Sequence, residues 1–246
     1  MNEWNDILEK LRNALNNQEV ESFHILEDLV PIEEQMEYFR YFDQLRTDNV
    51  KFIRDDEIAI LFSPDISIER KKRSLTLLSS IPDVGAYRSI ETYQSSPLEP
   101  ELKNWSSIAL IGSRIALSSD LSGKKQVYIS SGLGGHENKL RFFSLFTGPK
   151  GEDFTELQKE IIEREFRFQL KIADVETETF NIENNYFSIL LLFPFEVDVR
   201  AILKTTVDEC NKYGNFLDYN FLFTNTKVMN DVEIQKIVEN KKLRVQ

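Results

Sequence analysis

One glycine-rich segment, SSGLGGHENKLRFF at residues 130–143, carries the residue types of an anion-binding site. Successive backbone N–H groups in a glycine-rich turn can form a concave site for an anion. The candidate ligand-binding residues are Gly132, Gly134, Gly135, His136, Asn138, Lys139 and Arg141. The segment matches neither GxGxxG nor GxxxxGK[ST], and it leads into a strand instead of a helix. Glycines between two strands also suit a turn with positive φ. A structural turn is therefore the favoured interpretation, and an anion-binding loop is the alternative.

Metal-binding residues show no ligand spacing. His24 and His136 are the only histidines, and they lie far apart in the sequence. Asp174, Glu176 and Glu178 would line one face of a strand, which a hard cation could use. No tight Asp/Gly-rich loop accompanies this row, so a solvated strand face is favoured. The sequence therefore predicts no metal site.

Catalytic motifs are missing too: GxSxG, HExxH and CxxC do not occur. The single cysteine, Cys210, falls within an amphipathic helical pattern, where a lone cysteine is usually a small buried side chain. These observations favour a non-enzymatic protein without a cofactor.

The C-terminal stretch IQKIVENKKLRVQ is locally basic. Its candidate partner-binding residues are Lys236, Lys241, Lys242 and Arg244. This tail could contact RNA or an acidic surface; a frayed solvated helix and packing on the acidic N-terminal half are the alternatives. Elsewhere nucleic acid is an improbable partner, because the strand NYFSILLLF lacks the basic residue and glycine of an RNA-recognition strand.

Composition fits a folded protein of one large or two modest domains: 246 residues, 41% hydrophobic and 29% charged. The net charge of −11 is uneven, with 13 basic and 22 acidic residues in positions 1–120 against 17 and 19 in the rest. An acidic N-terminal half argues against nucleic-acid binding there.

One cysteine, no secretory signal and no long apolar run predict a cytoplasmic protein without a membrane span.

The first 120 residues predict helices, because apolar residues recur at helical spacing. The expected helices cover residues 4–15, 19–29, 32–45, 55–62, 67–81, 85–93 and 100–117. Residues 55–121 resemble helix pairs of the HEAT or armadillo kind: an offset of 33 residues lays Leu75, Leu77 and Leu78 over Ile108, Leu110 and Ile111. The turns IPDV (81–84) and ELKNW (101–105) carry the same resemblance, which implies a protein-binding surface. A plain helical bundle is the alternative.

After residue 122 the apolar period changes from 3.6 to 2. Strands are expected at 126–131, 139–147, 173–182, 185–195 and 215–225, with helices at 154–170 and 198–214. From residue 139 the β-α-β-β-α-β order resembles the ferredoxin-like fold. In that fold the first strand, here residues 139–147, already lies between two other strands. A hairpin with residues 126–131 would give it a third neighbour, which conflicts with the standard strand order. Apolar residues on both faces of the sheet require a second cover: the N-terminal helices, a second copy of the chain or a partner.

The sequence thus predicts an α+β protein: an acidic, HEAT-like helical domain at 1–121, a ferredoxin-like βαββαβ domain with an extra strand at 122–228, and a basic tail at 229–246. The combination resembles bacterial proteins that join a short helical repeat to such a domain; the resemblance implies no activity. The predicted function is a non-enzymatic cytoplasmic protein-interaction or scaffold protein, with a protein partner or a homodimer through the sheet face. The alternatives are a ribosome- or RNA-associated factor that uses the tail and the Lys139/Arg141 edge, and a small-anion or nucleotide-binding sensor at the Gly132–Gly135 loop.

Overall fold

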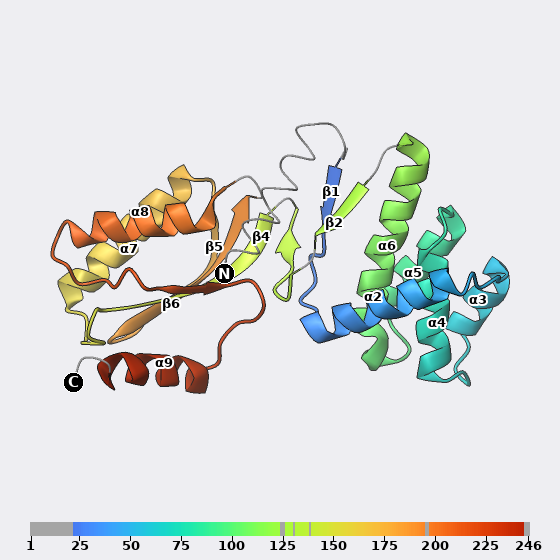
Figure 1. Cartoon of the computed structure of the whole chain (residues 1–246), viewed down its shortest axis with the longest axis horizontal. Coiled ribbons are helices and arrows are strands. Elements are labelled where there is room, and N and C mark those ends of the chain that lie inside the picture. Colours follow the sequence, from blue (N-terminus) through green and yellow to red (C-terminus); the bar gives the residue numbers. More distant parts are fainter. Residues whose placement is uncertain (1–21, 124–125, 130, 138, 195–196, 244–246) are drawn as a thin grey trace. The chain divides into compact units, whose positions relative to one another are not determined.

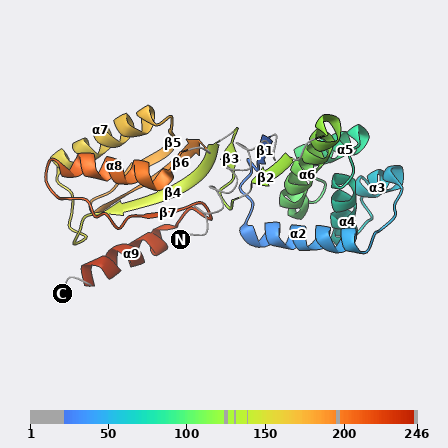
Figure 2. The ribbon, with the colours of Figure 1, turned by 45° about the horizontal axis from the view of Figure 1, so that its top comes forward.

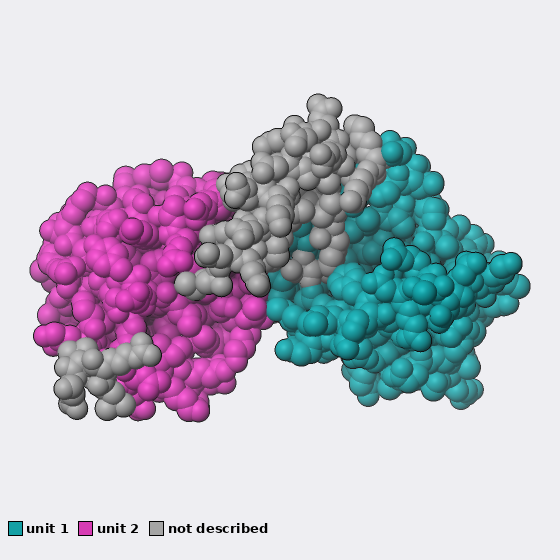
Figure 3. Space-filling view, viewed as in Figure 1, with its two compact units in different colours: residues 1–134 teal, residues 135–246 magenta. Residues whose placement is uncertain are grey.

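The structure is a computed structural model that describes residues 22–123, 126–129, 131–137, 139–194 and 197–243. The chain forms two compact units, Met1–Gly134 and Gly135–Gln246 (Figure 3). The expected helix at 4–15 lies outside the described residues.

The first unit is built mainly from helices, and each helix expected between residues 32 and 117 is present (Figure 1). They are α2 (Ile32–Thr47), α3 (Arg54–Leu61), α4 (Ile68–Ser79), α5 (Val84–Ser95), the short 3-10 helix η1 (Pro100–Leu102) and α6 (Lys103–Ser122). Ser67 caps α4 by accepting a hydrogen bond from the Arg70 backbone N–H, and Asp83 caps α5 through Ala86. Gly123, with φ of 67°, ends α6 in a left-handed conformation that suits glycine.

Helix α4 is the centre of this unit, because α2, α3, α5 and α6 all pack against it. Its Leu75 and Leu78 are fully buried in a core that also takes Ile90 from α5 and Ile108 from α6. Helix α2 contributes Tyr38, whose ring packs edge-on against Trp105 at a centroid distance of 5.0 Å. The hydroxyl groups of Tyr38 and Ser79 lie 2.7 Å apart in a buried hydrogen bond. These contacts fix the positions of α2, α4 and α6 relative to one another.

A small parallel sheet completes the first unit. Strand β1 (Ser22–Ile25) pairs with β2 (Gln126–Ile129), and the Leu26 backbone N–H extends the ladder to the carbonyl of Ile129. The expectation of a helix over residues 19–29 is therefore wrong where the structure describes the chain, because pairing with a strand about 100 residues away overrides local helical periodicity. The expected boundary at residue 121 differs from the division after Gly134, since β2 belongs to the first unit.

The second unit has the α+β class that the sequence predicts. Its elements are β3 (Gly135–His136), β4 (Lys139–Thr147), α7 (Glu156–Ile172), β5 (Glu176–Ile182), β6 (Tyr186–Pro194), α8 (Val199–Asn211), β7 (Leu222–Thr224) and α9 (Asp231–Leu243). The antiparallel sheet runs β7–β4–β6–β5, which is the strand order of a βαββαβ unit. The conflict over the first strand is resolved because β2 pairs with β1 within the first unit, and the neighbours of β4 in its sheet are β3, β6 and β7. The short β3 pairs with the start of β4, and β7 pairs further along it.

The two faces of this sheet have different covers (Figure 2). Helices α7 and α8 lie on one face, where Phe146 of β4 stacks on Phe187 at 4.7 Å and meets Phe166 of α7 at 5.0 Å. Helix α9 lies on the other face, with Ile234 and Val238 buried. Helix α9 of the same unit is thus a cover for the second face of the sheet. The sequence analysis expected that cover to be the N-terminal helices, a second copy of the chain or a partner. None of the described helices is long and apolar enough to cross a membrane.

Candidate functional site

The first part of the glycine-rich segment, up to Gly134, belongs to the first unit. Gly132 and Gly134 are buried, and Gly134 has φ of 62°. A Cβ atom at Gly134 would lie 2.5 Å from the carbonyl oxygen of Glu27 and 2.6 Å from that of Asp28. The glycine is required because the backbone of the β1–α2 connection approaches this closely. Gly135 and His136 form β3, which turns into β4 through Glu137, and Asn138 lies outside the described residues.

The basic residues that follow are ion-paired with the acidic row formed by Asp174, just before β5, and by Glu176 and Glu178 in β5. Lys139 Nζ lies 2.8 Å from Glu176 Oε1 and 3.1 Å from Asp174 Oδ2. Arg141 binds the Glu178 carboxylate through two nitrogens, at 2.6 and 2.7 Å. Hydrogen bonding to Glu176 raises the pKa of Lys139 above its ordinary value. The basic residues considered for an anion and the acidic residues considered for a metal therefore neutralise each other, in ion pairs that reach from β4 across β6.

The basic tail is also bound within its own unit. Lys241 Nζ of α9 donates to Thr147 Oγ1, Asp218 Oδ2 and the Asn220 carbonyl, each at 2.8 Å. Lys236 is exposed, while the side chain of Lys242 and the whole of Arg244 lie outside the described residues. Lys241 therefore holds α9 on the sheet instead of facing a partner.

The thiol group of the single cysteine is buried as well. Cys210 on α8 is buried, and burial raises the pKa of its thiol to about 12, so the thiolate form is scarce at neutral pH. Across the described ranges no group of three His, Cys, Asp or Glu side chains could hold a metal ion.

The first unit contains a buried ionic cluster that the sequence analysis missed. The fully buried Lys71 places Nζ 2.6 Å from Glu99 Oε1, and the Tyr93 hydroxyl donates to Glu99 Oε2 at 2.5 Å. Burial opposes ionisation of Glu99, but hydrogen bonds from Lys71 and Tyr93 outweigh it, so the pKa of this carboxyl lies below its ordinary value. Burial and the Glu99 carboxylate raise the pKa of Tyr93. The cluster ties α4 and α5 to the connection before η1.

The open space in this unit lies beside α2. An apolar cavity of about 260 Å³, here called the α2–α4–α6 groove, is bounded by three helices. Its lining residues are Tyr38, Phe39, Phe42, Ser79, Ser80, Ile108, Ile111, Gly112, Ile115 and Ala116. Gly112 stands in the interior of α6, where glycine costs about 0.5–1 kcal/mol relative to alanine. A Cβ atom there would meet Ser79 Cβ at 3.7 Å, an ordinary contact, so the glycine leaves room in the groove without being sterically required.

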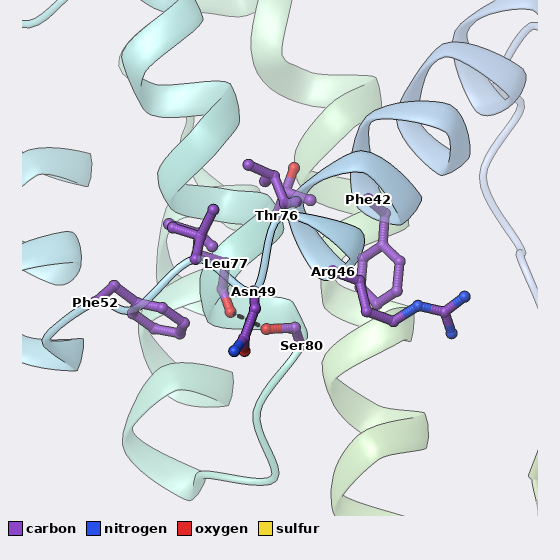
Figure 4. A pocket seen from close by; sticks show the side chains of 9 residues that line it. Phe42, Arg46, Asn49, Phe52, Thr76, Leu77 and Ser80 are labelled. Carbon is purple, nitrogen blue, oxygen red and sulfur yellow. Dashed lines mark hydrogen bonds between the residues drawn. The ribbon is translucent and has the colours of Figure 1, made fainter.

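A second cavity of about 220 Å³, here called the helix-end cavity, lies where α2 and α4 end. Its lining residues are Phe42, Leu45, Arg46, Asn49, Val50, Phe52, Thr76, Leu77 and Ser80. Phe42 and Ser80 also line the groove, so the two spaces adjoin at these side chains. Figure 4 shows Asn49 and Ser80 between the rings of Phe52 and Phe42, with the Arg46 guanidinium directed away from them.

Comparisons with known proteins identify partial likeness in fold alone. No protein-family model matches the chain, and no curated protein matches its sequence. Among solved structures, one neighbour is a protein described as a transposase from Deinococcus radiodurans R1, with 12% identity and a TM-score of 0.37 over 44% of this chain and 94% of that one. Another is a REP-associated tyrosine transposase bound to a REP hairpin, with 9% identity and a TM-score of 0.32 over 42% of this chain and 64% of that one.

These neighbours correct the functional predictions made from sequence. Both are described as transposases, and one is bound to a REP hairpin. These descriptions contradict the predictions of a non-enzymatic interaction or scaffold protein with a protein partner or a homodimer, and of nucleic acid as an unlikely partner except at the tail. The RNA-associated and anion-sensor alternatives are not kept either. The physical reason is that Lys139 and Arg141 are ion-paired with Glu176 and Glu178. A partial likeness of this kind transfers no reaction to this chain.

Proposed function

We propose that the first unit binds a small molecule whose apolar part lies in the α2–α4–α6 groove. The observation that supports this most is the lining of the groove, in which aromatic and aliphatic side chains from three helices surround a space of about 260 Å³. Together with the adjoining helix-end cavity, its volume falls in the range of about 300–1,000 Å³ that is usual for small-molecule sites.

The walls of the groove are held in place before any ligand arrives. Tyr38 is fixed by its hydrogen bond to Ser79 and by its contact with Trp105. Phe42 stacks on Tyr38 with ring centroids 6.4 Å apart and 21° between the ring planes. A rigid wall lowers the ordering cost of binding. The polar side chains of the lining are Tyr38, Ser79 and Ser80, and the hydroxyl groups of Tyr38 and Ser79 lie together, which suits an amphipathic molecule.

Exposed apolar side chains extend the groove outward on α2. Phe39 lines the groove and is 39% exposed, and Met36, one turn earlier, is 57% exposed. Apolar area removed from water contributes about 25 cal/mol per Å², so a ligand that covers this rim adds to its affinity. A cytoplasmic location belongs to the same proposal, supported by the single cysteine of the sequence.

A neutral fluorescent probe tests this proposal. N-phenyl-1-naphthylamine, titrated into the full chain, should bind once per chain with a rise in fluorescence. Gly112→Leu places a branched side chain in the groove and should lower probe affinity at least tenfold, because each buried methylene that loses its place is worth about 0.8 kcal/mol. The matched control is Arg114→Leu, on an exposed position of the same helix. A chain that binds no probe, or a Gly112→Leu variant that binds as well as the wild type, would overturn the proposal.

A further inference from the structure

We infer that the ligand of the α2–α4–α6 groove carries a cationic ammonium group, which lies in the helix-end cavity. This inference rests on the proposed function, since it names the chemical class of the molecule bound there. Two independent features of the cavity support it: the helix ends that meet at it and the aromatic rings that flank it.

The first feature is the convergence of two helix C-termini. Leu45 and Arg46 belong to the last turn of α2, and Thr76 and Leu77 belong to the last turn of α4; all four line the cavity. A helix C-terminus carries a partial charge of about −0.5, and nearby cations are favoured by it. Two such ends at one cavity therefore each contribute a negative potential there.

The second feature is a pair of aromatic rings. Phe42 and Phe52 both line the cavity, on either side of Asn49 in Figure 4. The negative faces of aromatic rings attract ammonium groups, and recognition of quaternary ammonium ligands uses such aromatic walls. The same negative ring faces disfavour an anion.

Arg46 is the single basic residue among the lining side chains, and its charge is directed elsewhere. Its guanidinium pairs with Asp43 Oδ1 at 3.1 Å, and its side chain is 74% exposed. In Figure 4 the guanidinium points away from Phe52, Asn49 and Ser80, so the methylene part of Arg46 forms the wall. A remaining repulsion from this charge gives a further test, because its removal should strengthen the binding of a cation.

The continuity of the two spaces fixes how such a ligand would lie. Phe42 and Ser80 border both, so a chain in the groove can place its head in the helix-end cavity by passing these two side chains. An alkylammonium amphiphile meets both requirements at once: an apolar tail for three apolar helix faces and a cationic head for two helix ends and two rings.

Three chain-matched probes test the inference on the full chain by displacement of N-phenyl-1-naphthylamine: decyltrimethylammonium, 1-decanol and decyl sulfate, each below the concentration at which it forms micelles. Decyltrimethylammonium should bind roughly tenfold more tightly than 1-decanol, from the combined helix-end and aromatic contributions. Decyl sulfate should bind most weakly. Phe52→Leu should reduce the preference for ammonium over alcohol about threefold while leaving 1-decanol binding unchanged.

The arginine supplies a matched pair of variants. Arg46→Gln should strengthen ammonium binding, whereas Arg40→Gln, at an exposed α2 position that does not line the cavity, should leave it unchanged. If 1-decanol or decyl sulfate binds as tightly as the ammonium probe, the inference is overturned and the proposed function stands. If N-phenyl-1-naphthylamine itself does not bind, the proposed function fails and takes this inference with it.

Discussion

The substitution Glu99→Gln should destabilise the first unit through the charge that it leaves behind. Lys71 has a side-chain exposure of 0%, and Glu99, at 19%, is the carboxylate that pairs with it. Removal of one partner of a buried ion pair usually costs 3–5 kcal/mol. Because Glu99 is partly exposed and glutamine can still accept one hydrogen bond, we expect a loss at the low end, about 3 kcal/mol.

Urea unfolding followed by the fluorescence of Trp105 measures this loss. Trp4, the other tryptophan of the sequence, is first replaced by Phe so that one probe reports on the first unit. With an m value of about 1.5 kcal/mol/M, the midpoint should fall by about 2 M. Asp43→Asn makes the same chemical change in an exposed ion pair and should cost less than about 1 kcal/mol.

A second substitution separates the buried charge from a general loss of packing. Lys71→Met in the Glu99→Gln background removes the unpaired ammonium and should recover part of the lost stability. A Glu99→Gln protein within 1 kcal/mol of the wild type, or a double variant less stable than Glu99→Gln alone, would refute this reasoning.

The pH dependence gives the same cluster a distinct signature. The folded-state pKa of Glu99 is lowered, so its stabilising contribution is fully present above the unfolded-state pKa of about 4.3. That contribution disappears as the pH falls through the lower folded-state pKa. The wild type should therefore lose stability below about pH 4 more steeply than Glu99→Gln, which has no carboxyl at this position; equal slopes would count against the assignment.

Three further substitutions test other parts of the structure. Gly112→Ala should stabilise α6 by about 0.5–1 kcal/mol, seen as a higher midpoint in thermal unfolding, and an unchanged or lower midpoint would show that the groove has no room for a methyl group. Gly134→Ala should destabilise the first unit by at least about 2 kcal/mol in urea, because its Cβ would collide with the carbonyl of Glu27 and its positive φ disfavours alanine; a neutral effect would contradict that contact. Lys241→Met should release α9 from the sheet, because hydrogen bonds to a charged group are worth about 1.5–3 kcal/mol. Amide exchange in α9 should become at least about tenfold faster, while exchange in α7 stays unchanged. Exchange in α9 that stays slow would mean that burial of Ile234 and Val238 is enough to hold the helix.

Local patterns in the sequence were enough to predict most elements. The helical periods from residue 32 to 117 and the alternation of period after residue 122 correspond to observed helices and strands. The order β-α-β-β-α-β follows from these patterns alone and gives the α+β class. These features are predictable because hydrophobic periodicity is a property of neighbouring residues.

Strand β1 shows where local pattern fails. Residues 22–25 have no strong strand signal, and they form a strand because β2, about 100 residues later, offers them a free edge. The buried Lys71–Glu99–Tyr93 cluster is similar, since its members come from α4, α5 and the segment before η1. Neither feature leaves a short-range trace in the sequence.

The sequence alone determined which residue types are present: glycines with basic neighbours, an acidic row, a basic tail and amphipathic helices. Only the tertiary structure decided what they do. Lys139 and Arg141 pair with the β5 acids, Lys241 holds α9, and the glycine of the loop makes room for a distant backbone. The groove and the helix-end cavity depend on how three helices pack. The physical reason is that charge pairing, close backbone approach and cavities are contacts between residues far apart in the chain, and residue spacing within one segment does not encode them.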